Sequence, residues 1–271
     1  MLSHKLKAEW EGVAMNTSSE VSNAVWGGSK KHFGYYGGGI DVYEHTNGWV
    51  YYVTGFSENN VALRKFHLDN PDEAVYLKRS SSTLYAEEPG QKAKALAAHY
   101  TLASDGQYLY VPSITSSSTT TNVHRNYVWI MKFDLSTDQL APFSKGVSIS
   151  PGTYNYSSVI LLKSNLGKNE TWAYNFTGVA VDNNYLYTAQ ADGAVRTFNK
   201  ITGDSITYTS AIKAPRRMAS DGKDIWMIHG EKSLSKFSVR SGVLNTTPVL
   251  SLSGLIDPQA FSVQTVGGVQ Y

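Results

Sequence analysis

The residues best suited to bind a ligand are polar and aromatic side chains that directly precede apolar segments of the chain. They are His99, Tyr100, Tyr174, Asn175, Arg216, Arg217 and Gln259. An arginine guanidinium can bind a carboxylate or a phosphate through two parallel hydrogen bonds, and a tyrosine ring can stack on a sugar. These residue types indicate a site for a polar partner. A solvated cation pair at 216–217 and an ordinary hydrogen-bonded histidine at position 99 are the plainer alternatives.

Signatures of catalysis and of metal binding are missing from the sequence. The chain has no cysteine, and no two of its seven histidines have the spacing of a local zinc motif. It also lacks the Gly-x-Ser-x-Gly turn of serine hydrolases and the Asp-rich loops that bind calcium. Glu87 and Glu88 are adjacent, and adjacent residues of an extended chain point to opposite faces. We therefore expect no cofactor, although a site assembled from distant segments stays open.

The composition indicates a folded, β-rich chain without a strong charge of either sign. Its 271 residues include 18 tyrosines, only 17% are charged, and the net charge is +2. Nucleic-acid binding requires a cluster of lysine and arginine, whereas these residues are scattered along this chain. No apolar run is long enough to span a membrane as a helix. The sequence therefore predicts neither a nucleic-acid partner nor a membrane span.

Similar segments recur along the sequence, and three of them begin with a turn that contains aspartate. The turns are Asp105-Gly106, Asp182-Asn183 and Asp221-Gly222. Aspartate can hydrogen-bond its own backbone, and glycine tolerates a positive φ angle, so both favour turns. Each turn precedes Tyr-Leu-Tyr or Ile-Trp-Met, which predicts a strand, and a later strand contains Phe133, Phe198 or Phe237. Val179 and Met218, at matching positions, are 39 residues apart, a normal repeat length for four short strands.

This pattern resembles the β-propeller family and is closest to its NHL and YncE-like repeats. The resemblance implies an all-β fold in which four-stranded antiparallel blades pack around a central channel. We expect about five blades in a single domain of residues 1–271, and more if the chain is a piece of a longer protein. The predicted blades cover residues 37–98, 99–172, 175–213, 214–254 and 258–271, and a strand at 5–14 completes the last. A short helix is compatible with 93–99, and 113–125 reads as a polar insertion.

In a propeller, the innermost strand of each blade lines the channel, and ligands usually bind at its mouth. Alignment of the copies brings the seven candidate residues named above to this level. We therefore expect a non-catalytic binding module that recognises a protein or a glycan, within a larger extracellular or cell-envelope assembly. Many aromatic residues combined with few charged ones favour recognition over chemistry.

Two other functions stay open at this point. One is a propeller enzyme, such as a lyase, a lactonase or a glycosidase, with its site at the mouth of the channel. It would need clustered acids or metal ligands there, and the aligned positions supply few acids. The other is a structural spacer in a bacterial or phage surface particle. Fold alone does not decide between these functions, because propellers carry many unrelated activities.

Overall fold

The computed structural model describes most of the chain from residue 41 onward. The described residues are 41–54, 62–79, 101–115, 126–144, 147–149, 154–156, 159–166, 176–190, 192–230, 232–256, 258, 261, 263, 265–266 and 269–270. These residues form strands and turns, with no helix among them. The possible helix at 93–99 and the strand at 5–14 lie outside the described residues.

Four antiparallel sheets, called the first to fourth blades, follow one another along the chain. The first blade contains β1 (Asp41–Glu44), β2 (Trp49–Thr54), β3 (Ala62–His67) and β4 (Asn70–Arg79). The second contains β5 (Ala103–Ser104), β6 (Tyr108–Thr115), β7 (Asn126–Asp134) and β11 (Val159–Leu166), and β8 (Gln139–Leu140) also pairs with β7. Strands β9 (Val147–Ile149) and β10 (Tyr154–Tyr156) form a separate hairpin.

The third and fourth blades repeat the same order of neighbouring strands. The third contains β12 (Phe176–Val181), β13 (Tyr185–Gln190), β14 (Val195–Asn199) and β15 (Ser205–Thr209). The fourth contains β16 (Met218–Ser220), β17 (Asp224–His229), β18 (Ser233–Arg240) and β19 (Val243–Leu244), and β20 (Leu250–Leu252) also pairs with β18. A final hairpin joins β21 (Thr265–Val266) to β22 (Val269–Gln270).

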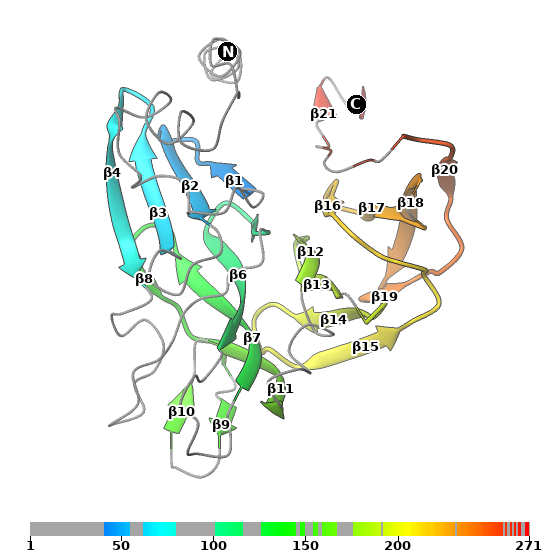
Figure 1. Cartoon of the computed structure of the whole chain (residues 1–271), viewed down its shortest axis with the longest axis horizontal. Coiled ribbons are helices and arrows are strands. Elements are labelled where there is room, and N and C mark those ends of the chain that lie inside the picture. Colours follow the sequence, from blue (N-terminus) through cyan, green and yellow to red (C-terminus); the bar gives the residue numbers. More distant parts are fainter. Residues whose placement is uncertain are drawn as a thin grey trace.

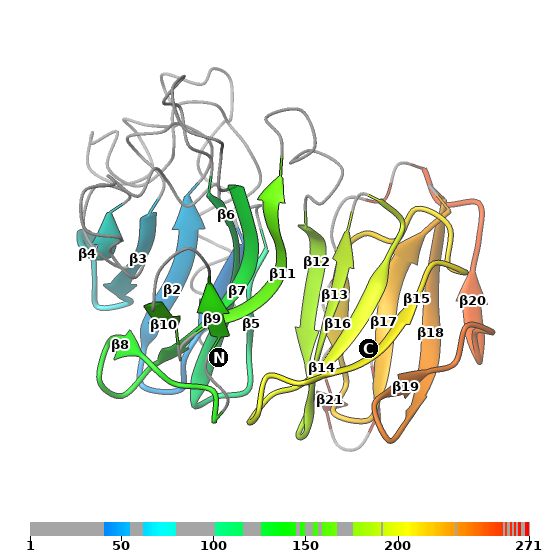
Figure 2. The same cartoon turned by 90° about the horizontal axis from the view of Figure 1, so that it is seen from below.

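The four sheets are arranged in a ring, with β1, β12 and β16 toward its centre and β4, β15 and β20 toward its outside (Figure 1). Figure 2 shows the blades from the side, with their strands running between the two faces of the ring. The predicted class, an all-β propeller of four-stranded antiparallel blades, is confirmed. The described residues form four blades rather than the predicted five, because only the hairpin β21–β22 is described in the last segment.

The predicted insertion at 113–125 begins too early. Ser113 pairs with Trp129, and Thr115 pairs with Tyr127, so β6 and β7 extend together beyond the predicted strand ends. The physical reason is that a polar side chain is compatible with a strand wherever its backbone is paired. The outer strand of the second blade is β11, which pairs with β7.

The hydrophobic cores lie between neighbouring blades because successive side chains of a strand point to opposite faces of a sheet. In the third blade, Leu186 and Phe198 are paired across β13 and β14 and pack against Tyr110 of the second blade. Tyr187, the next residue along β13, points the other way and packs with Ile225 and other core residues of the fourth blade. The third blade therefore shares one core with the second blade and another with the fourth.

Glycine permits the closest approach between the third and fourth blades. A Cβ atom on Gly178 would lie 2.6 Å from the backbone oxygen of Arg216. Gly242 has a φ of +78°, and a Cβ atom there would lie 2.8 Å from the ring of Tyr185. Both distances are shorter than a Cβ atom tolerates, so a larger residue would push the two blades apart.

Candidate functional site

Two of the seven predicted site residues, Arg216 and Arg217, lie among the described residues. They directly precede β16 and are half-buried. The Arg216 N–H donates to the carbonyl of Ile228 at 2.8 Å, and the Ile228 N–H donates to the carbonyl of Arg217 at 3.0 Å. These bonds fix both arginine backbones at the edge of the fourth blade. The other five, His99, Tyr100, Tyr174, Asn175 and Gln259, lie outside the described residues, so their gathering with the arginines stays a prediction.

The aspartate turns that define the sequence repeat connect the first and second strands of the second, third and fourth blades and are held by side-chain hydrogen bonds. In the second blade, Oδ1 of Asp105 accepts the N–H groups of Gln107 and Tyr108 at 3.1 and 2.8 Å. In the third blade, Oδ1 of Asp182 accepts the N–H groups of Asn184 and Tyr185, both at 2.7 Å. Each aspartate thus satisfies two backbone donors that the tight turn leaves without a strand partner.

The fourth blade contains the same turn. Oδ1 of Asp221 accepts the N–H groups of Lys223 and Asp224 at 3.0 and 2.8 Å. The backbone N–H of Asp221 also donates to the carbonyl of Asp224, as the N–H of Asp105 does to the carbonyl of Tyr108. The second, third and fourth blades therefore each contain a turn of the same kind, stabilised by the side chain of its aspartate.

The second carboxylate oxygen of each turn binds an aromatic side chain five residues further along. Tyr110 donates its hydroxyl to Asp105 at 3.2 Å, and Tyr187 donates its hydroxyl to Asp182 at 2.6 Å. In the fourth blade, the indole Nε1 of Trp226 donates to Asp221 at 3.1 Å. Tyr110 and Tyr187 stand on the second strands of their blades and pack in the cores shared with the following blades, so these two turns each orient a side chain of an interblade core.

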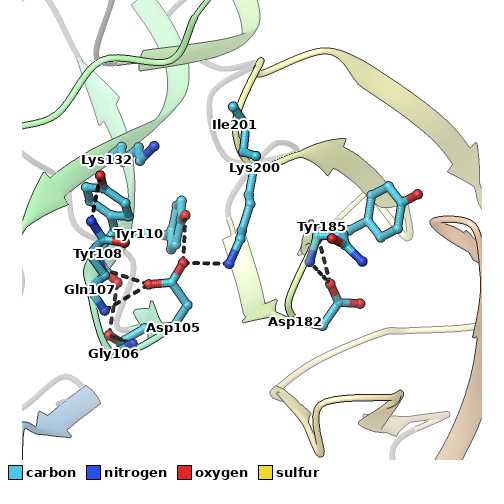
Figure 3. Close-up of polar contacts among 12 residues, drawn as sticks. Asp105, Gly106, Gln107, Tyr108, Tyr110, Lys132, Asp182, Tyr185, Lys200 and Ile201 are labelled. Atoms are coloured by element: carbon cyan, nitrogen blue, oxygen red, sulfur yellow. Dashed lines mark hydrogen bonds and ion pairs between the residues drawn. The ribbon is translucent and has the colours of Figure 1, made fainter.

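In two of the three turns, a lysine forms an ion pair with the aspartate. Lys200, at the end of β14 in the third blade, reaches back to Asp105 in the second blade with a distance of 2.8 Å (Figure 3). Lys236 of β18 binds Asp221 at 3.0 Å and Asp224 at 3.1 Å within the fourth blade. Asp182 has no ion pair among the described residues, because Val239 occupies the position in the fourth blade that Lys200 occupies in the third.

A second lysine lies beside the Asp105 turn. Lys132 of β7 is directly opposite Tyr110 and is only 6% exposed. Its Nζ atom lies 4.0 Å from the centre of the Tyr108 ring and donates to the carbonyl of Pro142 at 3.4 Å. Lys65 and Lys236 occupy the same position opposite Tyr51 and Trp226, whereas Thr197 stands opposite Tyr187. Lys65 forms an ion pair with Asp138, which ties the first blade to the second.

The environment of the turns fixes their charges. Burial raises the pKa of the Asp105 carboxyl, but hydrogen bonds from Lys200 and from two backbone N–H groups outweigh it and hold the pKa below its usual value. The same balance lowers the pKa of Asp221 to about 2. Burial also raises the pKa of Tyr110 and Tyr187, and the adjacent carboxylates raise it further. These groups stay in one charge state near neutral pH, so the turns are suited to structure rather than to proton transfer.

The outer strands of the third and fourth blades expose apolar side chains. Exposed fractions are 60% for Tyr208 on β15, 51% for Val243 on β19 and 49% for Leu252 on β20. Other exposed apolar residues in the same two blades are Ile201, Ile206, Val249 and Leu250. We call these seven residues the outer apolar strip. Sequence reasoning did not single them out, because strand alternation alone does not show which faces a neighbouring blade covers.

Metal ligands do not cluster in the part of the chain that the structure describes. No group of three histidine or acidic side chains there is close enough to hold an ion. Within the same residues, no helix has the length and apolar character needed to cross a membrane.

Comparison with known proteins finds similarities to solved structures. No family model and no curated protein matches the chain. A chain of the mitotic checkpoint complex is 11% identical with a TM-score of 0.41, and the match covers 79% of this chain and 50% of that one. This chain therefore spans about half the length of that relative.

Two other solved structures show similarities of the same strength. A protein assigned as a 6-phosphogluconolactonase from Bacteroides uniformis is 14% identical with a TM-score of 0.39, over 81% of this chain and 72% of that one. The computationally designed protein Ika4 is 9% identical with a TM-score of 0.38, over 77% of this chain and 96% of that one. Similarities at this level carry no argument about activity or partners.

Proposed function

We propose that the protein is a non-catalytic β-propeller module that binds a protein or glycan partner. The observation that supports this most directly is the outer apolar strip, five of whose seven residues lie on strands β15, β19 and β20. Large apolar side chains that gather on a surface mark interaction sites in soluble proteins. An assembly outside the cell or in its envelope is the setting in which we expect this partner.

The polar sites of the described residues support binding rather than catalysis. The carboxylates of Asp105 and Asp221 each accept two backbone hydrogen bonds, one aromatic donor and one lysine. A general acid or base needs a free lone pair or proton directed at the substrate. Carboxylates whose oxygens are already engaged in this way hold the fold together instead.

A second binding region is proposed at the edge of the fourth blade that carries Arg216 and Arg217. Their backbones are fixed by hydrogen bonds to Ile228, and both side chains are half-buried. Such ordered arginines are suited to a carboxylate or to sugar hydroxyls. Together with His99, Tyr100, Tyr174, Asn175 and Gln259 they form the ligand site that the repeat pattern predicts.

The test compares two double variants against the same partners. The wild-type protein is screened on immobilised glycans and on a peptide array, and its best ligand is then titrated. Tyr208→Ser with Leu252→Ser changes the outer apolar strip, and Arg216→Ala with Arg217→Ala changes the edge of the fourth blade. We expect one of the pairs to weaken binding at least tenfold while thermal unfolding changes little. Binding that survives both changes, or turnover of a bound glycan, contradicts the proposal.

A further inference from the structure

Strand β20, at the outside of the fourth blade, has one backbone edge that is open among the described residues. Its inner edge pairs with β18 in a register that places Ser251 opposite Ser235. In the part of the chain that the structure describes, no strand pairs with the other edge, which lies at the outside of the ring (Figure 1). Alternate N–H and C=O groups of an edge strand point away from its sheet. The open edge of β20 therefore presents such groups to another strand.

Hydrogen bonds hold β20 on its sheet, so this edge is already formed in the single chain. Ser235 donates its hydroxyl to Oγ of Ser251 at 2.7 Å, and its Oγ lies 2.8 Å from Nε2 of His229. The N–H groups of Val249 and Leu255, which flank β20, donate to carbonyl groups of the fourth blade at 2.8 and 3.0 Å. A strand that binds here meets an ordered edge, which lowers the entropic cost of binding.

The side chains along this edge are exposed and uncharged. Leu250 and Leu252 lie on one face of β20, with exposed fractions of 48% and 49%. The sequence from 243 to 256 contains no charged residue. Charged side chains commonly protect edge strands from pairing, and β4, the outer strand of the first blade, carries acidic and basic residues near its two ends. Strand β20 has no such charge, so two copies of it can approach without repulsion.

The sequence around β20 is symmetric about Ser251. Leu250 and Leu252 flank this residue, and Pro248 and Gly254 both lie three positions from it. Antiparallel pairing of two copies about Ser251 places each Leu250 opposite a Leu252 of the other copy. Paired residues then differ by an even number of positions, so the outward backbone groups of one copy meet the outward groups of the other. Pro248, which has no N–H, and Gly254, with a φ of +74°, end the pairing on both sides.

We propose that β20 pairs with β20 of a second copy of this chain, antiparallel and with a two-fold axis at Ser251. The sheets of the two fourth blades then become one continuous sheet. Directly paired residues lie on the same face, so the two leucines of each copy form one apolar cluster across the axis. This inference goes beyond the proposed function, because the second copy occupies β20 and leaves Tyr208 of the third blade to another partner.

The dimer is tested first by sedimentation equilibrium of the full chain. The paired segment between Pro248 and Gly254 is short compared with stable interfaces, so we expect a weak dimer that forms toward millimolar concentration. Leu250→Lys with Leu252→Lys places lysines opposite lysines and weakens the association about tenfold or more. Leu250→Glu with Leu252→Lys places opposite charges across the axis, so association returns at low salt and is lost at high salt.

A control variant separates the effect of position from that of net charge. Ser205→Lys with Ser210→Lys adds the same two positive charges at exposed serines of the third blade. We expect this variant to associate like the wild type. Thermal unfolding of each variant shows that it is folded.

The pairing register is tested by cross-linking, because the chain contains no cysteine. Ser251→Cys and Ser253→Cys each introduce one thiol at an exposed position. The two thiols at position 251 face each other across the axis. Those at position 253 lie four residues apart along the paired strands, or about 13 Å, which is too far for a disulfide. Under mild oxidation, Ser251→Cys should form a linked dimer much faster than Ser253→Cys.

Three results overturn the proposal: a wild type that stays monomeric at millimolar concentration, an association that the two lysines do not weaken, or equal cross-linking of the two cysteine variants. A monomer that loses an arrayed peptide on Leu252→Ser alone assigns this edge to a different protein. That result rejects the second copy and leaves the proposed function intact. A dimer with the expected register that binds nothing on the arrays supports this inference and contradicts the proposed function.

Discussion

The turns at Asp105 and Asp182 have the same local structure but differ in how they connect to the following blade (Figure 3). Both carboxylates accept two backbone N–H groups and one tyrosine hydroxyl. Asp105 also binds Lys200 of the following blade, whereas Val239 takes the place of that lysine beside Asp182. The comparison separates two tasks: the aspartate forms the turn, and the residue opposite it determines whether the blades are joined by charge or by apolar packing.

The largest expected effect is on the Asp105 turn. Asp105→Ala leaves Lys200 without its partner, with Lys132 also close to this turn, and removes two backbone hydrogen bonds. Leaving a mostly buried charge unpaired costs about 3–5 kcal/mol. Asp182→Ala removes the equivalent backbone hydrogen bonds but leaves no lysine unpaired. We therefore expect the free energy of unfolding to fall by about 1–3 kcal/mol. Urea unfolding of both variants measures the difference, and equal costs would show that Lys200 contributes little.

Acid should weaken the fourth blade through Asp221. Its pKa is about 2 in the folded protein, against about 3.9 in an unfolded chain. A lowered pKa stabilises the fold above pH 4, and this contribution disappears as the pH falls from about 4 to about 2. It amounts to about 2 kcal/mol. Over this pH range, the free energy of unfolding should fall more steeply in the wild type than in Asp221→Asn. Parallel pH profiles of the two proteins would contradict the assignment of this pKa to Asp221.

Removal of the tyrosine hydroxyls should affect the two turns unequally. Tyr187→Phe leaves Oδ2 of Asp182 without its only described partner, at a cost of about 1–3 kcal/mol. In Tyr110→Phe, Oδ2 of Asp105 keeps Lys200, so a cost near the low end of about 0.5–1.5 kcal/mol follows. Chemical denaturation resolves the two variants. A larger loss in Tyr110→Phe would reverse the comparison.

The smallest effect is expected from placing a lysine beside Asp182. Val239→Lys reproduces the position of Lys200, but it replaces a half-buried apolar side chain that packs against the core between the third and fourth blades. The new ion pair and the lost packing nearly cancel, so the free energy of unfolding should change by less than about 1 kcal/mol. Val239→Met is the matched control for size. The lysine variant should exceed it in stability at low salt and lose this advantage in high salt.

The sequence predicted the local features of this fold better than the contacts across blades. The Asp-Gly and Asp-Asn turns and the strands after them follow from residues close in the chain, and the structure contains them. The bond from Lys200 to Asp105 joins residues 95 positions apart, and only the ring brings them together. Ser251 lies opposite Ser235 because of a strand register that the sequence pattern did not specify. Arg216 and Arg217 directly precede β16, and their association with the other five predicted ligand-binding residues stays a prediction.

The aromatic residue after the turn distinguishes the face of a blade that meets the next blade from the face that meets the previous one. Tyr51, Tyr110 and Tyr187 all point toward the next blade in chain order, and the contact with Lys200 is made from the later blade to the earlier one. A blade's two faces are consequently not interchangeable. An engineered blade inserted between the second and third would have to supply a lysine on its leading side and an aromatic donor on its trailing side, and reversing the blade order would match neither neighbour.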